Sequence, residues 1–285
     1  MSGKTGWPEA PEPLPHPVID NHCHLDISRT DEEPLGIDEA LSRASAAGIP
    51  RIVQVGCDLA SSRWAAQAAS SYDEIVAAIA LHPNEVPALA ERSELDAAID
   101  ELDELAAGPR VRAIGETGLD YFRTDESGRG AQHDSFRRHI ELAKKHDLTL
   151  MIHDRDAHDD VLAILDEVGA PDRWVMHCFS GDAAFARRCL DRGAHLSFAG
   201  TVTFKNAEPL REALAAAPRD RILVETDSPF LTPVPHRGRS NASYLIPLTV
   251  RSMAQTRGDD LGELCVAIEA NTFAAYGGAW GARGA

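Results

Sequence analysis

The chain has 285 residues, with 45 acidic and 28 basic side chains, and its formal net charge is −17 at pH 7. A charge of this sign repels phosphate. The charge therefore disfavours broad attachment to nucleic acid through a basic face. A nucleic-acid substrate remains compatible with it if bound cations and a few local Arg and Lys residues reverse the potential in one cleft. The sequence contains no run of about 18 apolar residues, which excludes a membrane-spanning helix.

The N-terminal residues and the cysteines both favour a cytoplasmic protein. Residues 1–17 are rich in proline and lack the basic start and apolar run of a secretory signal, so we expect a flexible arm there. The five cysteines are widely spaced and form no CxxC pair, which is typical of reduced thiols. We expect one folded domain over residues 18–278 and a C-terminal tail over residues 279–285.

Short runs rich in Val and Ile alternate with longer stretches that have apolar residues at helical spacing. The runs that predict strands are, in chain order, VIDNHCHL, RIVQVGC, IVAAIAL, VRAIGE, TLMIHD, WVMHCFS, HLSFAG and RILVETD. The stretches that predict helices are residues 37–47, 61–70, 94–107, 130–146, 157–168, 182–191 and 207–217, with further helices from about residue 244 onward.

Each interval between these strands suits one crossover helix and one parallel strand. Repetition of this unit along the whole chain predicts an α/β fold, a single (β/α)8 TIM barrel. An open doubly wound sheet is the alternative, but the first strand is followed by HCHLD rather than by a glycine-rich phosphate turn.

Side chains that bind metals recur at the carboxyl ends of the predicted strands. They are His22, His24, His82, Glu116, His153, His177 and Asp227. In a (β/α)8 barrel all these strand ends meet at one rim, which carries the active site. Their number at one rim favours a metal site over a chance arrangement.

Four of these residues support a more specific interpretation. His22 and His24 alternate in one strand, so both rings can face the same ion. Glu116 ends an apolar strand, where a carboxylate is costly to bury unless it pairs with a cation or a nearby arginine. Its two oxygens could each contact one of two metals. Asp227 could be a ligand, could accept the proton of a water, or could be a turn carboxylate.

The sequence resembles the TatD-type metal-dependent deoxyribonucleases, a branch of the amidohydrolase-like barrels. The matching segments, between residues 19 and 233, are DNHCHLD, ALHP, IGETGLDYFR, Gln132 with Phe136, MIHDRDA, MHCFSG, FAGTVTFKNA and VETDSPFLTP. The resemblance implies two divalent ions, either Mg²⁺, Mn²⁺ or Zn²⁺. It assigns the first ion to His22, His24, Glu116 and Asp227, and the second to Glu116, His153 and His177. It assigns the substrate cleft to His82, Asp120, Tyr121, Arg123, Ser180 and Lys205.

The chemistry of the cleft residues agrees with a phosphate-containing substrate. Arg123 and Lys205 could meet phosphate oxygens, and Ser180 could open a helix whose amide groups bind an anion. Tyr121 or Phe122 could support a base or a sugar. After the eighth strand the chain reads RGRSNASYL where the family commonly shows Arg-Asn-Glu-Pro, which leaves the substrate preference open.

We expect hydrolysis of DNA phosphodiester bonds, with Glu116 and Asp227 as the catalytic carboxylates and Asp227 taking the proton from the attacking water. Few aromatic residues and no basic stripe favour a short single-stranded end as the substrate, and hence exonuclease action. The alternative is hydrolysis of an ester, a lactone, a cyclic amide or an aminoacyl-tRNA ester on the same barrel. We expect no membrane partner and no obligate protein partner.

Overall fold

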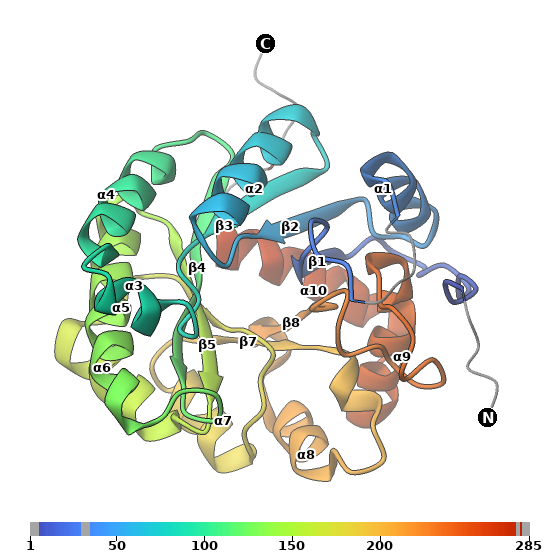
Figure 1. Ribbon diagram of the computed structural model, residues 1–285. Helices are drawn as coiled ribbons and strands as arrows, with labels where there is room; N and C mark the ends of the chain where they lie inside the picture. The colour runs from blue at the N-terminus through green and yellow to red at the C-terminus, as the bar shows by residue number, and fades with distance from the viewer. Residues whose placement is uncertain (1–5, 30–34, 278–279, 281–285) are drawn as a thin grey trace.

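The computed structural model describes residues 6–29, 35–277 and 280, and Figure 1 shows the strands at its centre with helices around them. The strands are β1 (Ile19–Cys23), β2 (Arg51–Val55), β3 (Ile75–Ile79), β4 (Val111–Asp120), β5 (Thr149–Arg155), β6 (Trp174–Met176), β7 (His195–Phe198) and β8 (Ile222–Val224). They follow one another in chain order, and each is parallel to the next. This confirms the predicted (β/α)8 architecture.

Backbone hydrogen bonds close the barrel between its first and last strands. The Asp227 amide donates to the His22 carbonyl at 2.9 Å, and the His24 amide donates to the Ser228 carbonyl at 2.8 Å. Both bonds lie at the carboxyl ends of β1 and β8. Closure therefore brings the first and last segments of the predicted site together, although about two hundred residues separate them in sequence.

The helices are α1 (Ile37–Ala46), α2 (Leu59–Ser71), α3 (Val86–Glu91), α4 (Leu95–Ala106), α5 (Glu126–Lys145), α6 (His158–Val168), α7 (Ala183–Leu190), α8 (Glu208–Ala216), α9 (Ile246–Arg257) and α10 (Leu261–Tyr276). Helix α5 begins four residues before the predicted start because the Asp125 carboxylate accepts hydrogen bonds from the Ser127 and Gly128 amides. Helix α3 was not predicted, because a single short turn carries too few residues to show a period.

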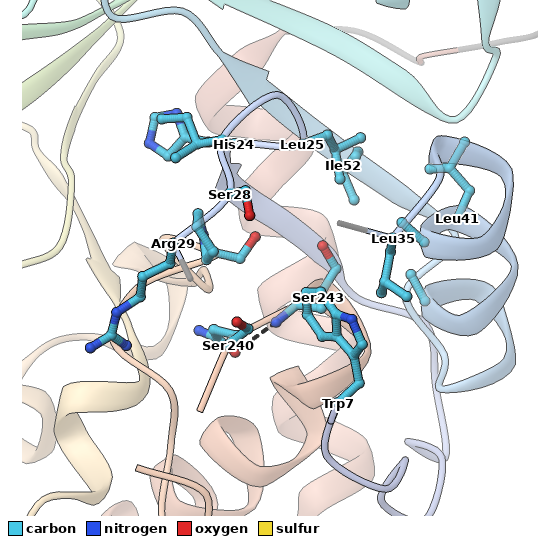
Figure 2. A pocket seen from close by; sticks show the side chains of 17 residues that line it. Trp7, His24, Leu25, Ser28, Arg29, Leu35, Leu41, Ile52, Ser240 and Ser243 are labelled. Carbon is cyan, nitrogen blue, oxygen red and sulfur yellow. Dashed lines mark hydrogen bonds between the residues drawn. The ribbon is translucent and has the colours of Figure 1, made fainter. Parts of the chain in front are cut away.

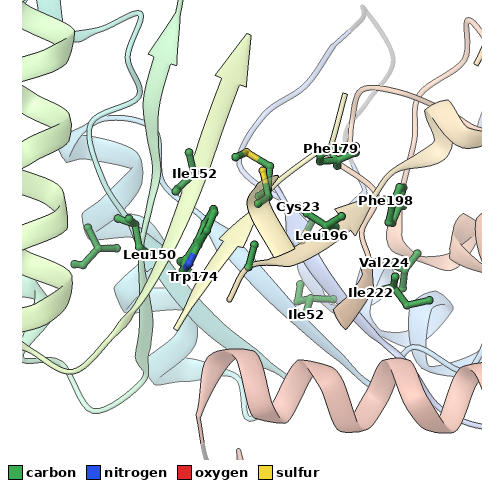
Figure 3. Close-up of a cluster of buried hydrophobic side chains, with 14 of the residues drawn as sticks. Cys23, Ile52, Leu150, Ile152, Trp174, Phe179, Leu196, Phe198, Ile222 and Val224 are labelled. Atoms are coloured by element: carbon green, nitrogen blue, oxygen red, sulfur yellow. The ribbon is translucent and has the colours of Figure 1, made fainter. Parts of the chain in front are cut away.

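Two apolar layers hold the barrel together. Val53, Val76 and Val175 are among the side chains that fill the inside of the barrel. A larger cluster lies between the strands and the surrounding helices, and Figure 3 shows part of it, including Ile152 and Trp174. Successive strand residues alternate between these two layers, so both faces of the sheet are buried.

Helix α10 covers the amino-terminal end of the barrel. The Thr149 hydroxyl, at the start of β5, donates to the Ala275 carbonyl at 2.6 Å, and Asn271 Nδ2 donates to the Ile222 carbonyl at 2.9 Å. Tyr276 and Trp280 add their rings to the inner cluster. With this end closed, the carboxyl end of the barrel is the side on which polar strand ends meet.

The N-terminal segment differs from the expected flexible arm. The Tyr244 hydroxyl donates to the Pro8 carbonyl at 2.7 Å, Arg251 donates to the Pro13 carbonyl at 3.0 Å, and Leu14 is buried. Proline cannot donate a backbone hydrogen bond, but its carbonyl accepts one, so this segment is held from outside without regular structure. Residues 1–5 of the predicted arm and most of the predicted tail over 279–285 lie outside the described residues; Trp280 is buried. Among the described helices, none has the length and hydropathy needed to cross a membrane.

Candidate metal centre

The Glu116 carboxylate lies at the centre of the polar cluster at the carboxyl end of the barrel. Its Oε1 atom is 2.6 Å from His153 Nδ1 and 3.3 Å from His177 Nε2. Its Oε2 atom is 3.5 Å from His22 Nε2. The two oxygens thus face two different sets of imidazoles. Among the described residues, the ion-pair partners of Glu116 are histidines and no arginine, so the alternative of an arginine pair does not hold.

His24 and Asp227 complete the side of the cluster that faces Oε2. His22 Nε2 is 3.0 Å from His24 Nε2, and Asp227 Oδ1 is 3.7 Å and 3.6 Å from these two nitrogens. His24 Nδ1 lies 3.0 Å from the Val55 carbonyl, to which it donates. That bond fixes the proton on Nδ1 and leaves the Nε2 lone pair for a cation. Asp227 has φ 52°, a left-handed conformation that is uncommon for a residue other than glycine.

The donor atoms of this cluster fit a bound divalent cation. Imidazole nitrogens and carboxylate oxygens are the ligands that Zn²⁺ and related ions take, and here they converge, with His22, His24, Glu116 and His177 buried and His153 and Asp227 partly exposed. Burial by itself would raise the pKa of Glu116, but His177, His82 and His153 hold it well below its usual value. The carboxylate therefore stays ionised and available as a ligand.

The histidines on the Oε1 side are held by further carboxylates. Burial opposes the charge on His153, but hydrogen bonds to Asp120 and Glu116 raise its pKa to about 9. Burial also opposes the charge on His177, whose pKa is raised well above its usual value by Glu225 and Glu116. A cation that bound to these rings would displace the protons, so its affinity should increase with pH.

His82 has a different hydrogen-bonding pattern from His24. The Asn84 amide donates to His82 Nδ1 at 3.1 Å, which leaves the proton of a neutral ring on Nε2. Nε2 lies 3.5 Å from Glu116 Oε1. This pattern suits a hydrogen-bond donor at the edge of the cluster better than a metal ligand.

Asp120 lies beneath the expected cleft rather than on its surface, with 1% of its surface exposed. Its Oδ1 accepts hydrogen bonds from the Phe122 amide at 3.0 Å and the Arg123 amide at 2.9 Å. Its Oδ2 lies 3.1 Å from Asn84 Nδ2 and 3.3 Å from His153 Nε2. Both oxygens are engaged with the protein, so Asp120 holds His153 and the following loop and offers no free oxygen to a substrate.

The other expected cleft residues differ in how accessible they are. Arg123 and Lys205 are exposed on the loops that follow β4 and β7, as phosphate contacts require. The Tyr121 hydroxyl is already bonded to His133 Nε2 at 2.5 Å and to the Asp160 carboxylate. Ser180 is exposed but does not open α7.

Helix α7 begins at Ala183, and its N-cap residue is Asp182. The Asp182 carboxylate accepts a hydrogen bond from the Phe185 amide at 2.8 Å. A negative charge therefore already occupies the helix N-terminus that Ser180 was expected to open toward an anion. Ser180 therefore does not open the helix as expected, and the Asp182 carboxylate already accepts one of its N-terminal amides.

Sequence reasoning missed two groups beside the cluster. Glu225 is buried, accepts a hydrogen bond from the Cys178 amide at 2.9 Å, and has Oε1 2.9 Å from His177 Nδ1. Its position two residues before Asp227 is a signal that could have placed it near the site. Cys57 Sγ lies 4.0 Å from Glu116 Oε2. No spacing in the sequence pointed to this thiol.

Gly118 permits the close approach of β4 to β5 beside the cluster. Its φ is 143°, and a Cβ atom at this position would lie 2.0 Å from the His153 carbonyl oxygen. Any larger residue would therefore push β5 and His153 away from Glu116.

A small pocket lies next to His24, between α1 and the loop that follows β8 (Figure 2). Trp7, Leu25 and Leu41 give it a mostly apolar wall, and His24 and Ser243 lie at its edges. Its volume is about 40 Å³, enough for a few water molecules and too small for a nucleotide. At the carboxyl end of the barrel 17% of the Asp227 side chain is exposed, so the cluster is open to solvent on that side.

Comparisons with known proteins match nearly the whole chain to one family. Residues 19–277 match the family model described as TatD-related DNase. An uncharacterised metal-dependent hydrolase, TatD, of Mycobacterium tuberculosis is 43% identical over 267 residues, which cover 92% of this chain and 99% of that protein. The uncharacterised metal-dependent hydrolase YabD of Bacillus subtilis is 40% identical over 241 residues, or 84% of this chain and 91% of that protein. The crystal structure of the TatD homologue YJJV from Escherichia coli superposes with a TM-score of 0.82 at 28% identity, covering 91% of this chain and 97% of that one.

Proposed function

This chain belongs to the TatD-related DNase family and is a metal-dependent hydrolase, and from that premise we propose that it hydrolyses phosphodiester bonds of DNA with two divalent cations. The family description supports a DNA substrate. Arg123 and Lys205, exposed on the loops that follow β4 and β7, support a phosphate-containing substrate on a chain whose net charge would otherwise repel it.

The observation that carries the two-cation proposal is the orientation of the Glu116 carboxylate. One oxygen faces His22, with His24 and Asp227 nearby, and the other faces His153 and His177. A carboxylate placed in this way can share its oxygens between two cations. A pair of such cations would clamp the scissile phosphate and lower the pKa of the attacking water.

The residues of the chain then have distinct tasks. Asp227 is partly exposed at the edge of the cluster, where it accepts the proton of the attacking water. Burial alone would raise its pKa, but His24, His177 and His22 lower it, which keeps the carboxylate ionised. His82 Nε2 donates to a phosphate oxygen, because its Nδ1 is already an acceptor for the Asn84 amide. Arg123 and Lys205 neutralise the developing charge from the rim.

We further propose that the substrate is a short single-stranded end and that cleavage is exonucleolytic. The pocket beside His24 is too small for a nucleotide, and the chain has no basic stripe along which a duplex would lie. A strand that enters the mouth of the barrel by its end avoids most of the acidic surface.

The test is nucleotide release from linear and circular single-stranded DNA, with Mg²⁺, Mn²⁺ or Zn²⁺ added to the metal-depleted protein. Activity should require the metal and should fall at least about a hundredfold in Glu116→Gln, because that variant loses one of the shared ligand oxygens. Glu126→Gln is the matched control, since this exposed carboxylate lies in the first turn of α5 and contacts none of the histidines. Equal cleavage of circular DNA would contradict exonuclease action. A folded, metal-loaded protein that hydrolyses esters or lactones but no DNA would overturn the proposed substrate.

A further inference from the structure

An exposed aromatic ring lies on the loop that follows β4, two residues after Asp120. Phe122 is 63% exposed, the highest value among the large apolar side chains that the structure describes. Single exposed apolar residues are ordinary on protein surfaces, so exposure alone assigns no role to this ring. Its support from behind and its connection to the metal centre distinguish it from an incidental surface residue.

One face of the Phe122 ring is supported by a cation. The Arg155 guanidinium carbon lies 3.9 Å from the ring centroid, which is the geometry of a cation–π contact. Arg155 ends β5, pairs in register with Asp120, and accepts a hydrogen bond from the Tyr121 amide at 2.9 Å. With one face against Arg155 and most of the side chain exposed, the opposite face of the ring is open to solvent.

The same carboxylate that holds the metal centre also holds this loop. Asp120 Oδ1 accepts the Phe122 and Arg123 amides, while Asp120 Oδ2 is 3.3 Å from His153 Nε2. The loop therefore has a defined position relative to the cluster. Order imposed before binding reduces the entropy that a ligand must remove when it stacks on the ring.

The neighbouring aromatic residue is engaged in the fold. The Tyr121 hydroxyl is bonded to His133 and Asp160, and the Arg129 guanidinium carbon lies 4.1 Å from the Tyr121 ring centroid. Tyr121 is half-buried under these contacts. It supports the loop from below and presents no free face for a ligand.

We propose that Phe122, backed by Arg155, is a stacking platform for an unpaired nucleobase of the substrate strand, with Arg123 contacting the adjacent phosphate. The proposal rests on the proposed function and assigns the base contact to Phe122 rather than to Tyr121. A flat ring suits any base because every base has a π-face, so the platform selects unpaired strands without selecting their sequence. A base pair inside a duplex has both faces covered by its neighbours and cannot use it.

The experiment compares a short single-stranded oligonucleotide with one of the same length that carries abasic units at its 3′ end. The metal-loaded wild type should prefer the base-containing strand roughly tenfold, a typical value for one stacked base. Phe122→Ala should lose this preference through a rise in KM for the base-containing strand, with little change for the abasic one. Phe122→Trp should retain it, whereas Phe122→Leu, which is apolar but has no flat face, should lose most of it.

Val266→Ala is the matched control, because Val266 is 50% exposed on α10 and should leave both values unchanged. A wild type without preference for bases, or a Phe122→Ala or Phe122→Leu variant that keeps the full preference, would overturn the platform. If no DNA is cleaved, the proposed function fails. The dissociation constants of the same two oligonucleotides, measured by fluorescence anisotropy on the same metal-loaded proteins, then test whether Phe122 stacks on a base.

Discussion

Replacing Glu225 with Gln removes one negative charge behind the His177 ring and leaves the size of the side chain almost unchanged. Gln can still accept the hydrogen bond from the Cys178 amide through its side-chain oxygen, so the local backbone should keep its conformation. The variant therefore isolates the effect of the charge that lies 2.9 Å from His177 Nδ1. We expect it to bind Zn²⁺ more weakly than the wild type.

The magnitude follows from the distance and the burial of the pair. Two opposite charges at this separation attract by roughly 6 kcal/mol at an effective dielectric constant of about 20. Desolvation of the buried carboxylate offsets much of this attraction. Loss of a carboxylate that supports a metal-binding histidine typically lowers the metal affinity about 10- to 100-fold, or about 1.4–2.8 kcal/mol, and we expect a value in this range.

The loss should depend on pH in a defined direction. Burial opposes the charge on His177, but Glu225 and Glu116 raise its pKa well above the usual value, so in the wild type a proton competes with the metal for this ring. Glu225→Gln lowers that pKa and weakens the competition. The zinc dissociation constant of the variant, divided by that of the wild type, should therefore be smallest at acidic pH. This ratio should reach its full value once the ring is deprotonated in both proteins.

Zinc dissociation constants from competition with a chelating dye, measured across the pH range, test this reasoning. Asp182→Asn is a suitable control, because this carboxylate caps α7 on the loop after β6 that also carries His177, and no contact of it with an imidazole is found among the described residues. Circular dichroism checks that each variant is folded. Equal zinc affinity of Glu225→Gln and the wild type at every pH would refute the assignment of Glu225 to the support of a metal ligand.

Three further predictions concern the stability of the fold. Removal of metal by a chelator should lower the Tm by about 5–10 °C, since a cation at a hundred times its Kd contributes about 2.7 kcal/mol, and an unchanged Tm in a thermal melt would contradict a bound ion. Burial lowers the pKa of His139 from 6.5 to about 4, and its Nε2 accepts the Leu81 amide at 3.1 Å. Because the folded state keeps this ring neutral, its contribution is complete above pH 6.5, and about 3 kcal/mol should be lost as the pH falls from there through 4. In the His139→Gln variant the free energy of unfolding, measured by urea denaturation at each pH, should fall less with decreasing pH than in the wild type. The same pH dependence in both proteins would contradict this prediction. Gly118→Ala should destabilise the protein by at least about 2 kcal/mol, because its Cβ would meet the His153 carbonyl oxygen, whereas Gly130→Ala, with open space around it, should be neutral or stabilising in the same melts.

The barrel and the metal-binding set could be predicted because both follow from local periodicity. Apolar strands of similar length recur with helices between them, and parallel connection places every carboxyl end at one rim. His22, His153 and Asp227 could be assigned to one site without any knowledge of distances. Their partners were harder to find. Glu225 lies two residues before Asp227, but the sequence does not say which of these two carboxylates faces a histidine ring.

The site's immediate surroundings depended on tertiary contacts. Tyr121 and Phe122 are adjacent aromatic residues on one loop, and nothing in their sequence separates a supporting ring from an exposed one. His133 and Asp160 on α5 and α6 engage the first, while Arg155 on β5 supports the second. Ser180 was similarly misplaced, because the carboxylate of Asp182 already satisfies the start of α7.

The sequence by itself determined the class of fold, the rim and the ligand types, because these depend on the spacing of residues along single strands and helices. Only the tertiary structure decided which oxygen of Glu116 faces which histidines, which nitrogen of His24 and His82 carries the proton, and which aromatic ring remains open. These properties depend on the orientation of side chains relative to groups on other strands. Such groups meet only when the barrel closes, and their distances then set the charge, the tautomer and the exposure of each residue.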